Sequence, residues 1–266
     1  MPKPVFISII TVKGIIMYYR VVDELIETPG QLLDSRIISQ KSARKKRAEE
    51  LYQLFDVIGT FSSKQDVKMD IAMNIATYPE IYIPPLKNAL GSGREKVSFG
   101  DIGCFMIDRE IEIKSLISYM KQYQELCSEK KTWITEKDSD RECIWEYVWE
   151  KVRQTISSEL PARGNSVSLF GSEEEADSYR EEYYGDFGTV MQVEIKEQRA
   201  LGSYDMSWFT DVPGGVSYNE AAMYAGNYWH GKENDEPVKE YLLDGTYILS
   251  SVGSDEIYDL PQPDNN

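Results

Sequence analysis

The sequence predicts an α+β protein, because strand-like and helix-like patterns fall in separate parts of the chain. Residues 15–22 are rich in β-branched and aromatic side chains, which is typical of a strand. Residues 38–158 carry apolar side chains mainly at helical spacing, and after Leu160 short strand patterns alternate with short helices. We therefore expect one domain over residues 1–253. Its β core would comprise residues 1–36 and 160–252, with a mostly helical insertion over residues 38–158.

The β core is expected to begin with a hairpin. Residues 5–12 and 15–22 form two apolar runs, and Lys13 and Gly14 between them suit a turn. The interrupted run is too short for a membrane span.

The helical insertion opens with a basic run, residues 41–47, on a helix whose apolar face comprises Leu51, Leu54, Phe55 and Ile58. A run of this kind is usually a solvated helix face. Contact with RNA or another polyanion is the alternative interpretation.

The second half of the chain carries clear boundary signals. Ser139 with Glu142, Ser172 with Glu175, and Ser217 with Glu220 have the spacing of a capping box and predict three helix starts. Residues 166–170 and 190–195 are predicted strands. The dipeptide Asp244-Gly245 predicts a tight turn between strands over residues 238–243 and 247–252.

The formal net charge of −16 is concentrated after Leu160, where there are 21 acidic and 6 basic residues. Residues 1–159 have 24 acidic and 23 basic residues. The acidic half should repel nucleic acid unless a local basic surface compensates. The acidic, proline-containing tail, residues 254–266, is expected to be disordered.

The three cysteines show no CxxC spacing, and the chain has a single histidine. We therefore expect no disulfide framework, no bound metal and a cytoplasmic location. The motifs GxGxxG, GxxxxGK[ST], HExxH and GxSxG are all missing from the sequence. Their absence disfavours dinucleotide-binding Rossmann domains, P-loop enzymes, zinc proteases and α/β-hydrolases.

Four short segments, taken in order, carry the functional signal of the sequence. They are Tyr18-Tyr19-Arg20, Leu160-Pro161-Ala162-Arg163 with Ser166, Ser168 and Leu169-Phe170 after it, Tyr228-Trp229-His230-Gly231, and Glu240 ahead of Asp244-Gly245. Together they resemble the Arg-Ser-Glu branch of the ADP-ribosyltransferase superfamily, and bacterial and phage members in particular. The resemblance covers residues 15–36 and 140–252.

This resemblance implies a split β core of two packed small sheets and NAD as a substrate. It implies an enzyme that cleaves the bond between nicotinamide and ribose and transfers ADP-ribose to a macromolecule. A toxin or phage-defence effector, with an antitoxin or chaperone as partner, is the biological role that it suggests. The alternatives are an inactive interaction protein that keeps the scaffold, such as an inhibitor or a nucleic-acid mimic, and an NAD glycohydrolase.

Glu240 is the expected catalytic residue. Loss of nicotinamide builds positive charge on the ribose, as in glycoside hydrolysis. A carboxylate that is hydrogen-bonded to the 2′-hydroxyl stabilises this charge in the transition state more than in the ground state.

The resemblance also assigns groups that would hold NAD. Arg20 would bind the phosphates, with Arg163 as a second contact, because a guanidinium binds phosphate with two parallel hydrogen bonds. Ser166 or Ser168 would orient the groups around the carboxylate. An aromatic face beside the nicotinamide would come from Tyr179, Tyr183 or Tyr19.

Each of these residues also has an ordinary structural interpretation. Arg20 can form a surface ion pair, Arg163 can anchor a turn, and the serines can be exposed strand residues. Glu240 is one of many acids in an acidic region, and Tyr179 and Tyr183, four residues apart, can pack in a core.

The sequence departs from the family pattern at Val238. Members that modify protein side chains usually carry Gln or Glu two residues before the catalytic glutamate, at the position that Val238 occupies. Arginine of a protein is therefore less favoured as acceptor, and a nucleic acid such as RNA is slightly favoured over protein.

Overall fold

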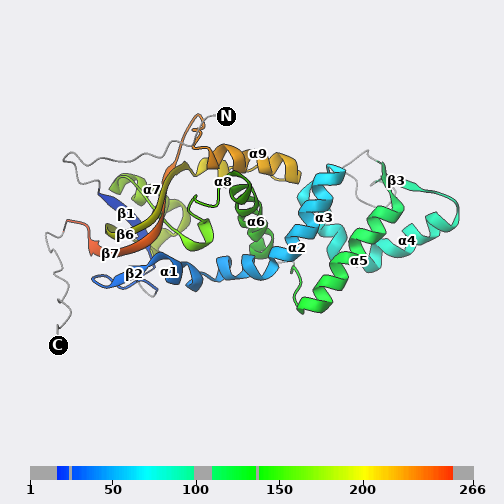
Figure 1. Ribbon diagram of the computed structural model, residues 1–266, viewed down its shortest axis with the longest axis horizontal. Coiled ribbons are helices and arrows are strands. Elements are labelled where there is room, and N and C mark those ends of the chain that lie inside the picture. Colours follow the sequence, from blue (N-terminus) through cyan, green and yellow to red (C-terminus); the bar gives the residue numbers. More distant parts are fainter. Residues whose placement is uncertain (1–16, 24–25, 99–109, 136–137, 254–266) are drawn as a thin grey trace.

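A computed structural model of the chain describes residues 17–23, 26–98, 110–135 and 138–253. A five-stranded antiparallel sheet lies at one end of the molecule, and helices extend from it toward the other end (Figure 1). This mixture of helices and antiparallel sheets agrees with the α+β class that the sequence predicts. The first arm of the expected N-terminal hairpin, residues 5–12, and the tail, residues 254–266, lie outside the described residues.

The five-stranded sheet is built from segments at both ends of the described chain. Its strands are β1 (Tyr18–Val22), β2 (Leu32–Asp34), β5 (Val167–Leu169), β6 (Thr189–Asp205) and β7 (Lys239–Ser251). One edge of β7 pairs with β6 along its whole length, and its other edge pairs with β2 and β5. β1 pairs with β6, so the long strands β6 and β7 form the centre of the sheet.

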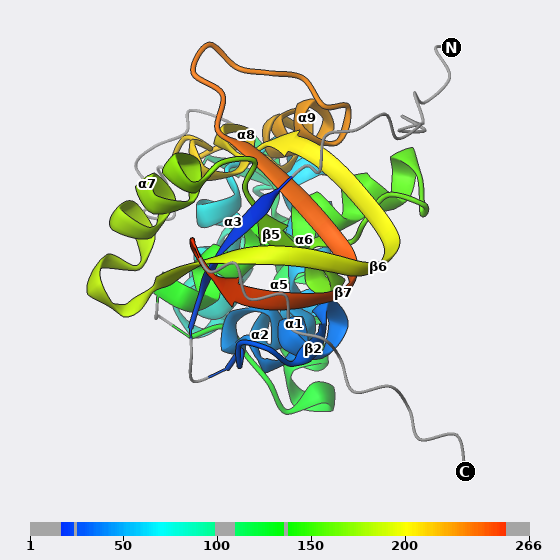
Figure 2. The ribbon, with the colours of Figure 1, turned by 90° about the vertical axis from the view of Figure 1, so that its left-hand side faces the viewer.

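Two hydrogen bonds close four of these strands into a ring. The amide of Tyr19 donates to the carbonyl of Phe170 at 2.9 Å, and the amide of Phe170 donates to the carbonyl of Tyr19 at 2.8 Å. Because Phe170 directly follows β5, these bonds join β1 to β5 (Figure 2). The inner side of the ring is mainly apolar and contains Tyr18, Val22, Val167, Leu169, Met191, Val193, Leu243, Tyr247 and Leu249.

The outer side of the ring is covered by helices. α7 (Glu173–Tyr183) packs on β1 through a small cluster that contains Val21, Phe170 and Ala176. α6 (Asp138–Ile156) and α9 (Tyr218–Trp229) pack against each other, and Leu242 of β7 belongs to the same hydrophobic core. The largest core of the protein therefore joins the outer side of the sheet to the helical part.

The segment between β2 and β5 is mostly helical. α1 (Ser35–Lys41) leads into α2 (Ala43–Gln65), which is followed by α3 (Met69–Thr77), α4 (Pro79–Gly91) and α5 (Ile113–Lys130). A two-stranded sheet, β3 (Lys96–Ser98) and β4 (Glu110–Glu112), lies within this part. The second small sheet thus comes from the insertion and not from the segments expected to form the β core. Among the residues that the structure describes, no helix has both the length and the apolar character needed to cross a bilayer.

Two of the three predicted capping boxes, those at Ser172 and Ser217, are confirmed. The prediction for Ser139 is wrong, because α6 begins at Asp138 and Ser139 lies inside the helix. The Ser172 hydroxyl accepts a hydrogen bond from the Glu175 amide, and the Glu175 carboxylate accepts one from the Ser172 amide. Ser217 and Glu220 make the same pair of bonds at the start of α9. These bonds satisfy amides that the first helical turn leaves without partners.

The predicted turn at Asp244-Gly245 is wrong, because β7 runs straight through both residues. The Gly245 amide donates to the Ser35 hydroxyl, and the backbone of Gly245 lies so close to Glu197 that a Cβ atom would be 2.1 Å from its carbonyl oxygen. The register of β6 against β7 shifts on both sides of this contact, between Ile195 and Glu197 and again at residues 198–200. Gly245 therefore allows the backbones of β6 and β7 to approach closely at a β-bulge.

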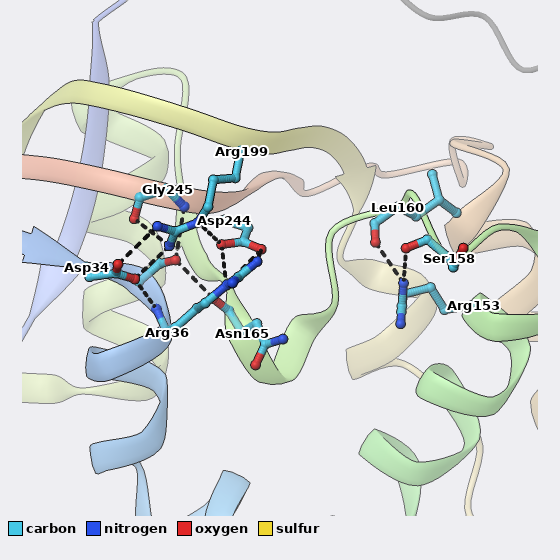
Figure 3. A network of polar contacts seen from close by, with 10 residues as sticks. Asp34, Arg36, Arg153, Ser158, Leu160, Asn165, Arg199, Asp244 and Gly245 are labelled. Carbon is cyan, nitrogen blue, oxygen red and sulfur yellow. Dashed lines mark hydrogen bonds and ion pairs between the residues drawn. The ribbon is translucent and has the colours of Figure 1, made fainter.

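Asp244 belongs to a network of charged side chains that fastens α1 and β2 to the long strands (Figure 3). Its carboxylate accepts from Arg199 at 2.8 Å and from Arg36 at 2.8 Å, and Arg199 also donates to Asp34 at 2.6 Å. Burial favours the neutral form of Asp244, but the two arginines outweigh it and lower its pKa. The hydrogen bond from Arg199 is the main cause that lowers the pKa of Asp34.

The space around Gly245 and Gly226 predicts opposite effects when each is changed to alanine. Gly245→Ala should lower the free energy of unfolding by about 1–3 kcal/mol, because the new methyl group must displace the backbone of Glu197. Gly226→Ala, in the middle of α9 with no atom within 4 Å of the new Cβ, should raise it by about 0.5–1 kcal/mol. Urea denaturation measures both, and a neutral Gly245→Ala would contradict the close approach.

The charged network predicts a loss of stability that depends on pH. A carboxyl group with a lowered pKa contributes stability above its ordinary pKa of about 3.9, and this is lost as the pH falls through the lowered value. Arg199→Met should therefore lower the Tm clearly at about pH 7 and by a smaller amount at about pH 2, as protonation of the two aspartates weakens their ion pairs. Lys196→Met on the same strand, whose partner Glu194 is 61% exposed, is the control. An equal loss at both pH values would show that Arg199 acts through packing alone.

Candidate functional site

Glu240, near the start of β7, is the centre of the candidate site. Its side chain has no exposed surface. One carboxylate oxygen, Oε1, accepts from Arg163 Nη1 at 2.7 Å and from the Tyr228 hydroxyl at 2.7 Å. The other, Oε2, accepts from the Ser168 hydroxyl at 2.9 Å. Three donors from three separate elements therefore fix both oxygens of the carboxylate.

Arg163 is the cation of the site and lies in a short 3₁₀ turn, η2 (Arg163–Asn165), directly before β5. Its Nε also pairs with the Glu146 carboxylate of α6 at 3.3 Å, and its guanidinium carbon lies 4.1 Å from the centre of the Phe209 ring. Burial opposes the charge of Arg163, but Tyr228, Glu240 and Glu146 outweigh it and raise the pKa of Arg163 well above its ordinary value. Arg163 therefore stays protonated.

Lys45 of α2 holds the turn that carries Arg163. Its Nζ donates to the carbonyl of Arg163 at 2.7 Å, to the carbonyl of Ser166 at 2.8 Å and to the Ser39 hydroxyl at 3.2 Å. Burial lowers the pKa of Lys45 to about 8, although the negative charge of Glu146 opposes this shift. The position of Arg163 is thus set by a lysine more than a hundred residues earlier in the chain.

The two candidate serines differ in their surroundings. Ser168 lies in β5 and contacts Glu240 directly. Ser166 precedes β5, and its buried hydroxyl has no hydrogen-bond partner among the described residues. Its carbonyl, by contrast, accepts from Lys45 and Ser39. Of the two, Ser168 is the serine that meets the carboxylate.

Arg20 does not share a pocket with Glu240. It alternates along β1 with Tyr19 and Val21, which face outward, so its side chain lies on the inner side of the ring. There it pairs with Glu27 at 2.8 Å and donates to the carbonyl of Ser168 at 3.0 Å. Burial opposes the charge of Arg20, but Glu27 outweighs it and raises the pKa. Glu240 lies on the outer side, so β5 separates the two side chains.

The three candidate tyrosines lie together on the outer side of the ring, beside α7. Tyr19 packs in the cluster that includes Phe170, and the rings of Phe170 and Tyr179 are 4.9 Å apart. The rings of Tyr179 and Tyr183 are 4.7 Å apart. Burial is the main cause that raises the pKa of Tyr179, and the negative charge of Glu240 contributes. Tyr179 therefore lies within electrostatic reach of the carboxylate.

The basic run over residues 41–47 contributes internal contacts. Lys45 holds the turn with Arg163, and Arg47 donates to the Trp133 carbonyl at 2.8 Å and to the Thr132 hydroxyl at 3.2 Å. Both contacts tie the start of α2 to other segments of the chain. For these two side chains the interpretation as a solvated helix face is therefore wrong.

Four residues of the site had no assigned role in the sequence interpretation. Tyr228 belongs to the Tyr-Trp-x-Gly element. The sequence marked this element as part of the resemblance but assigned no role to the tyrosine. Glu146, Lys45 and Phe209 are brought to Arg163 by helix packing. No local pattern marks Glu146 or Phe209, and the basic run marked Lys45 without indicating this contact.

The site as it stands is closed to a dinucleotide. Arg163 and Arg20, the two predicted phosphate contacts, are each paired with internal carboxylates, and Glu240 is fully buried. A pocket of about 290 Å³ lies elsewhere, where Trp133, Tyr123 and Cys127 of the helical part are among its lining residues. Within the described ranges, no three His, Cys, Asp or Glu side chains are grouped so that they could hold a metal ion.

The buried ion pair predicts a large effect for removal of its cation. Arg163→Met should lower the free energy of unfolding by about 3–5 kcal/mol, because it leaves Glu240 charged and buried. Adding Glu240→Gln to that variant should restore part of the loss. Lys239 lies on the same strand as Glu240 and forms an exposed ion pair with Glu233. Lys239→Met should therefore change the free energy of unfolding by less than about 1 kcal/mol. Strictly additive effects of the two site substitutions would contradict the coupling.

No protein-family model matches this chain, and comparison with curated proteins finds no match either. What the site does must therefore follow from its own residues. These are a buried carboxylate, the three groups that bind it, and the aromatic rings beside it.

Proposed function

We propose that this protein is an NAD-dependent mono-ADP-ribosyltransferase, which cleaves the nicotinamide–ribose bond and passes ADP-ribose to a macromolecular acceptor. The observation that carries the proposal is the hydrogen bond of 2.9 Å from the Ser168 hydroxyl to Glu240. The sequence resemblance pairs a serine on a middle strand with a glutamate on a late strand. These two residues, 72 positions apart, are in direct contact through neighbouring strands.

In this proposal Glu240 stabilises the positive charge that develops on the ribose as nicotinamide leaves. Its low-dielectric surroundings strengthen that interaction, and its three donors fix its position before the reaction. Ser168 and Tyr228 orient the carboxylate as positioning residues. A nucleophile of the acceptor then forms the new bond to the sugar carbon that nicotinamide left, and it loses its proton.

Arg163 opens the site in the proposed reaction. Since its charge is balanced by Glu240 and Glu146, it can exchange Glu240 for an incoming diphosphate without becoming an unpaired cation. That exchange frees Oε1 of Glu240 for the 2′-hydroxyl of the ribose, while Ser168 keeps Oε2 in place. NAD binding and release of the carboxylate are therefore one step.

The second candidate function is an interaction protein that keeps the scaffold without catalysis. It is favoured by the complete burial of Glu240 and by the internal pairing of Arg20 and Arg163. Titration calorimetry with NAD separates the two proposals, since an inactive scaffold has no affinity for NAD. Release of free ADP-ribose in the absence of an acceptor would identify an NAD glycohydrolase instead.

The proposed chemistry predicts that Glu240→Gln abolishes activity and leaves the fold intact. Glutamine has the shape of glutamate and can still accept from Arg163, but it lacks the charge that stabilises the ribose cation. Transfer from labelled NAD to total RNA, DNA and protein should fall by at least about a hundredfold, which is the scale of losing one such electrostatic contact. Lys239→Gln, at the position directly before Glu240 on β7, should keep full activity.

Transfer that survives Glu240→Gln would remove this residue from the mechanism. A circular dichroism spectrum like that of the wild type at the assay temperature distinguishes lost chemistry from lost folding, because loss of the Glu240–Arg163 ion pair is itself expected to lower the Tm. Mass spectrometry of the three pools then identifies the acceptor, because only one of them gains the mass of ADP-ribose. In cells, growth arrest that Glu240→Gln relieves would indicate a toxin, for which an antitoxin or chaperone partner is then expected.

A further inference from the structure

An unusually exposed group of aromatic side chains lies at the C-terminal end of α7 and in the 3₁₀ turn η3 (Gly185–Phe187) that follows it. Phe187 is 91% exposed, Tyr183 is 48% exposed and Tyr184 is 38% exposed. Large apolar side chains that gather on a surface mark interaction sites more often than single exposed ones do. We call Tyr183, Tyr184 and Phe187, with the exposed acids Glu181 and Glu182, the α7 surface.

The charge around the α7 surface is strongly negative. Residues 172–187 contain seven acidic side chains and one basic side chain, Arg180. Arg180 is already paired with Asp177 at 2.8 Å and with Glu181 at 3.7 Å. The C-terminal end of a helix adds partial negative charge from its free carbonyls. Glu182 and Asp211 both contribute to the raised pKa of Tyr183, after burial, so their charges face the ring.

The α7 surface adjoins the candidate site. Tyr183 lies beside α8 (Ser207–Thr210), whose residue Phe209 stacks against Arg163. Tyr179, one turn before Tyr183, lies within electrostatic reach of Glu240. A partner bound to the α7 surface would therefore lie near the elements that border the candidate site.

We propose that the α7 surface is a docking site for a lysine- or arginine-rich segment of a partner polypeptide. Exposed tyrosine and phenylalanine faces attract ammonium and guanidinium groups, and the surrounding carboxylates add complementary charge. The phosphates of RNA would be repelled by the same carboxylates. The docking itself needs no cleavage of NAD and is therefore independent of the proposed function. A role of the docked partner as the ADP-ribose acceptor would rest on the proposed function.

The test measures binding of two fluorescent probes, a short arginine-rich peptide and a single-stranded RNA of similar length, by fluorescence anisotropy. The wild-type protein should bind the peptide more tightly than the RNA. Phe187→Ser should weaken peptide binding about fivefold, the scale of one cation–π contact. The double reversal of Glu181→Lys with Glu182→Lys should weaken it at least about tenfold.

A matched control carries the same change of charge at the other end of the molecule. Glu125→Lys with Glu129→Lys reverses two exposed acids on α5, far from α7 (Figure 1). This variant should bind the peptide as the wild type does. Equal weakening by the control, no effect of Phe187→Ser, or tighter binding of the RNA would each overturn the proposal. The measurement is repeated with Glu240→Gln, which should bind the peptide normally, so a failure of docking is distinguishable from a failure of the proposed chemistry.

Discussion

The ion pair between Glu240 and Arg163, with a distance of 2.7 Å, is the interaction on which the arrangement of this protein depends. Glu240 lies on the sheet, and Arg163 lies in the turn that leads into β5. Tyr228 of α9 and Glu146 of α6 join the same pair. A fully buried carboxylate is costly unless charge and hydrogen bonds compensate it. The pair therefore requires the ring of strands and the helices to meet at one point.

The same pair links stability to the proposed chemistry. A carboxylate held by three donors is fixed before any substrate arrives, which is what electrostatic stabilisation of a transition state requires. Its charge is balanced by Arg163 until an anion competes for the guanidinium. A dinucleotide carries such an anion in its diphosphate. Opening of the site and recognition of the substrate would then depend on one exchange of partners.

Local signals in the sequence predicted local structure well. The capping boxes at Ser172 and Ser217 are confirmed, because the hydrogen bonds of a box lie within four residues of the chain. The dipeptide Asp244-Gly245 was misleading for the opposite reason. Its aspartate is bound by Arg36 and Arg199, and its glycine admits the backbone of Glu197. These partners lie tens to hundreds of residues away, so no turn rule contains them.

The site was predicted in part. The order of the motifs placed Ser168 and Arg163 with Glu240, but the alternation of side chains along β1 places Arg20 on the other side of the ring. That separation depends on how the strands close through Tyr19 and Phe170, which the spacing of motifs does not encode. Lys45 comes from a helix outside the segments that the resemblance covers. Glu146 comes from α6, where no motif of the resemblance marks it.

A crystal structure with a non-cleavable NAD analogue tests the central claim most directly. The account predicts that the analogue's diphosphate binds Arg163 and that its nicotinamide ribose lies within hydrogen-bond distance of Glu240, with Ser168 still bound to the carboxylate. A structure in which saturating analogue leaves the pair between Glu240 and Arg163 intact, or binds elsewhere on the protein, would contradict it.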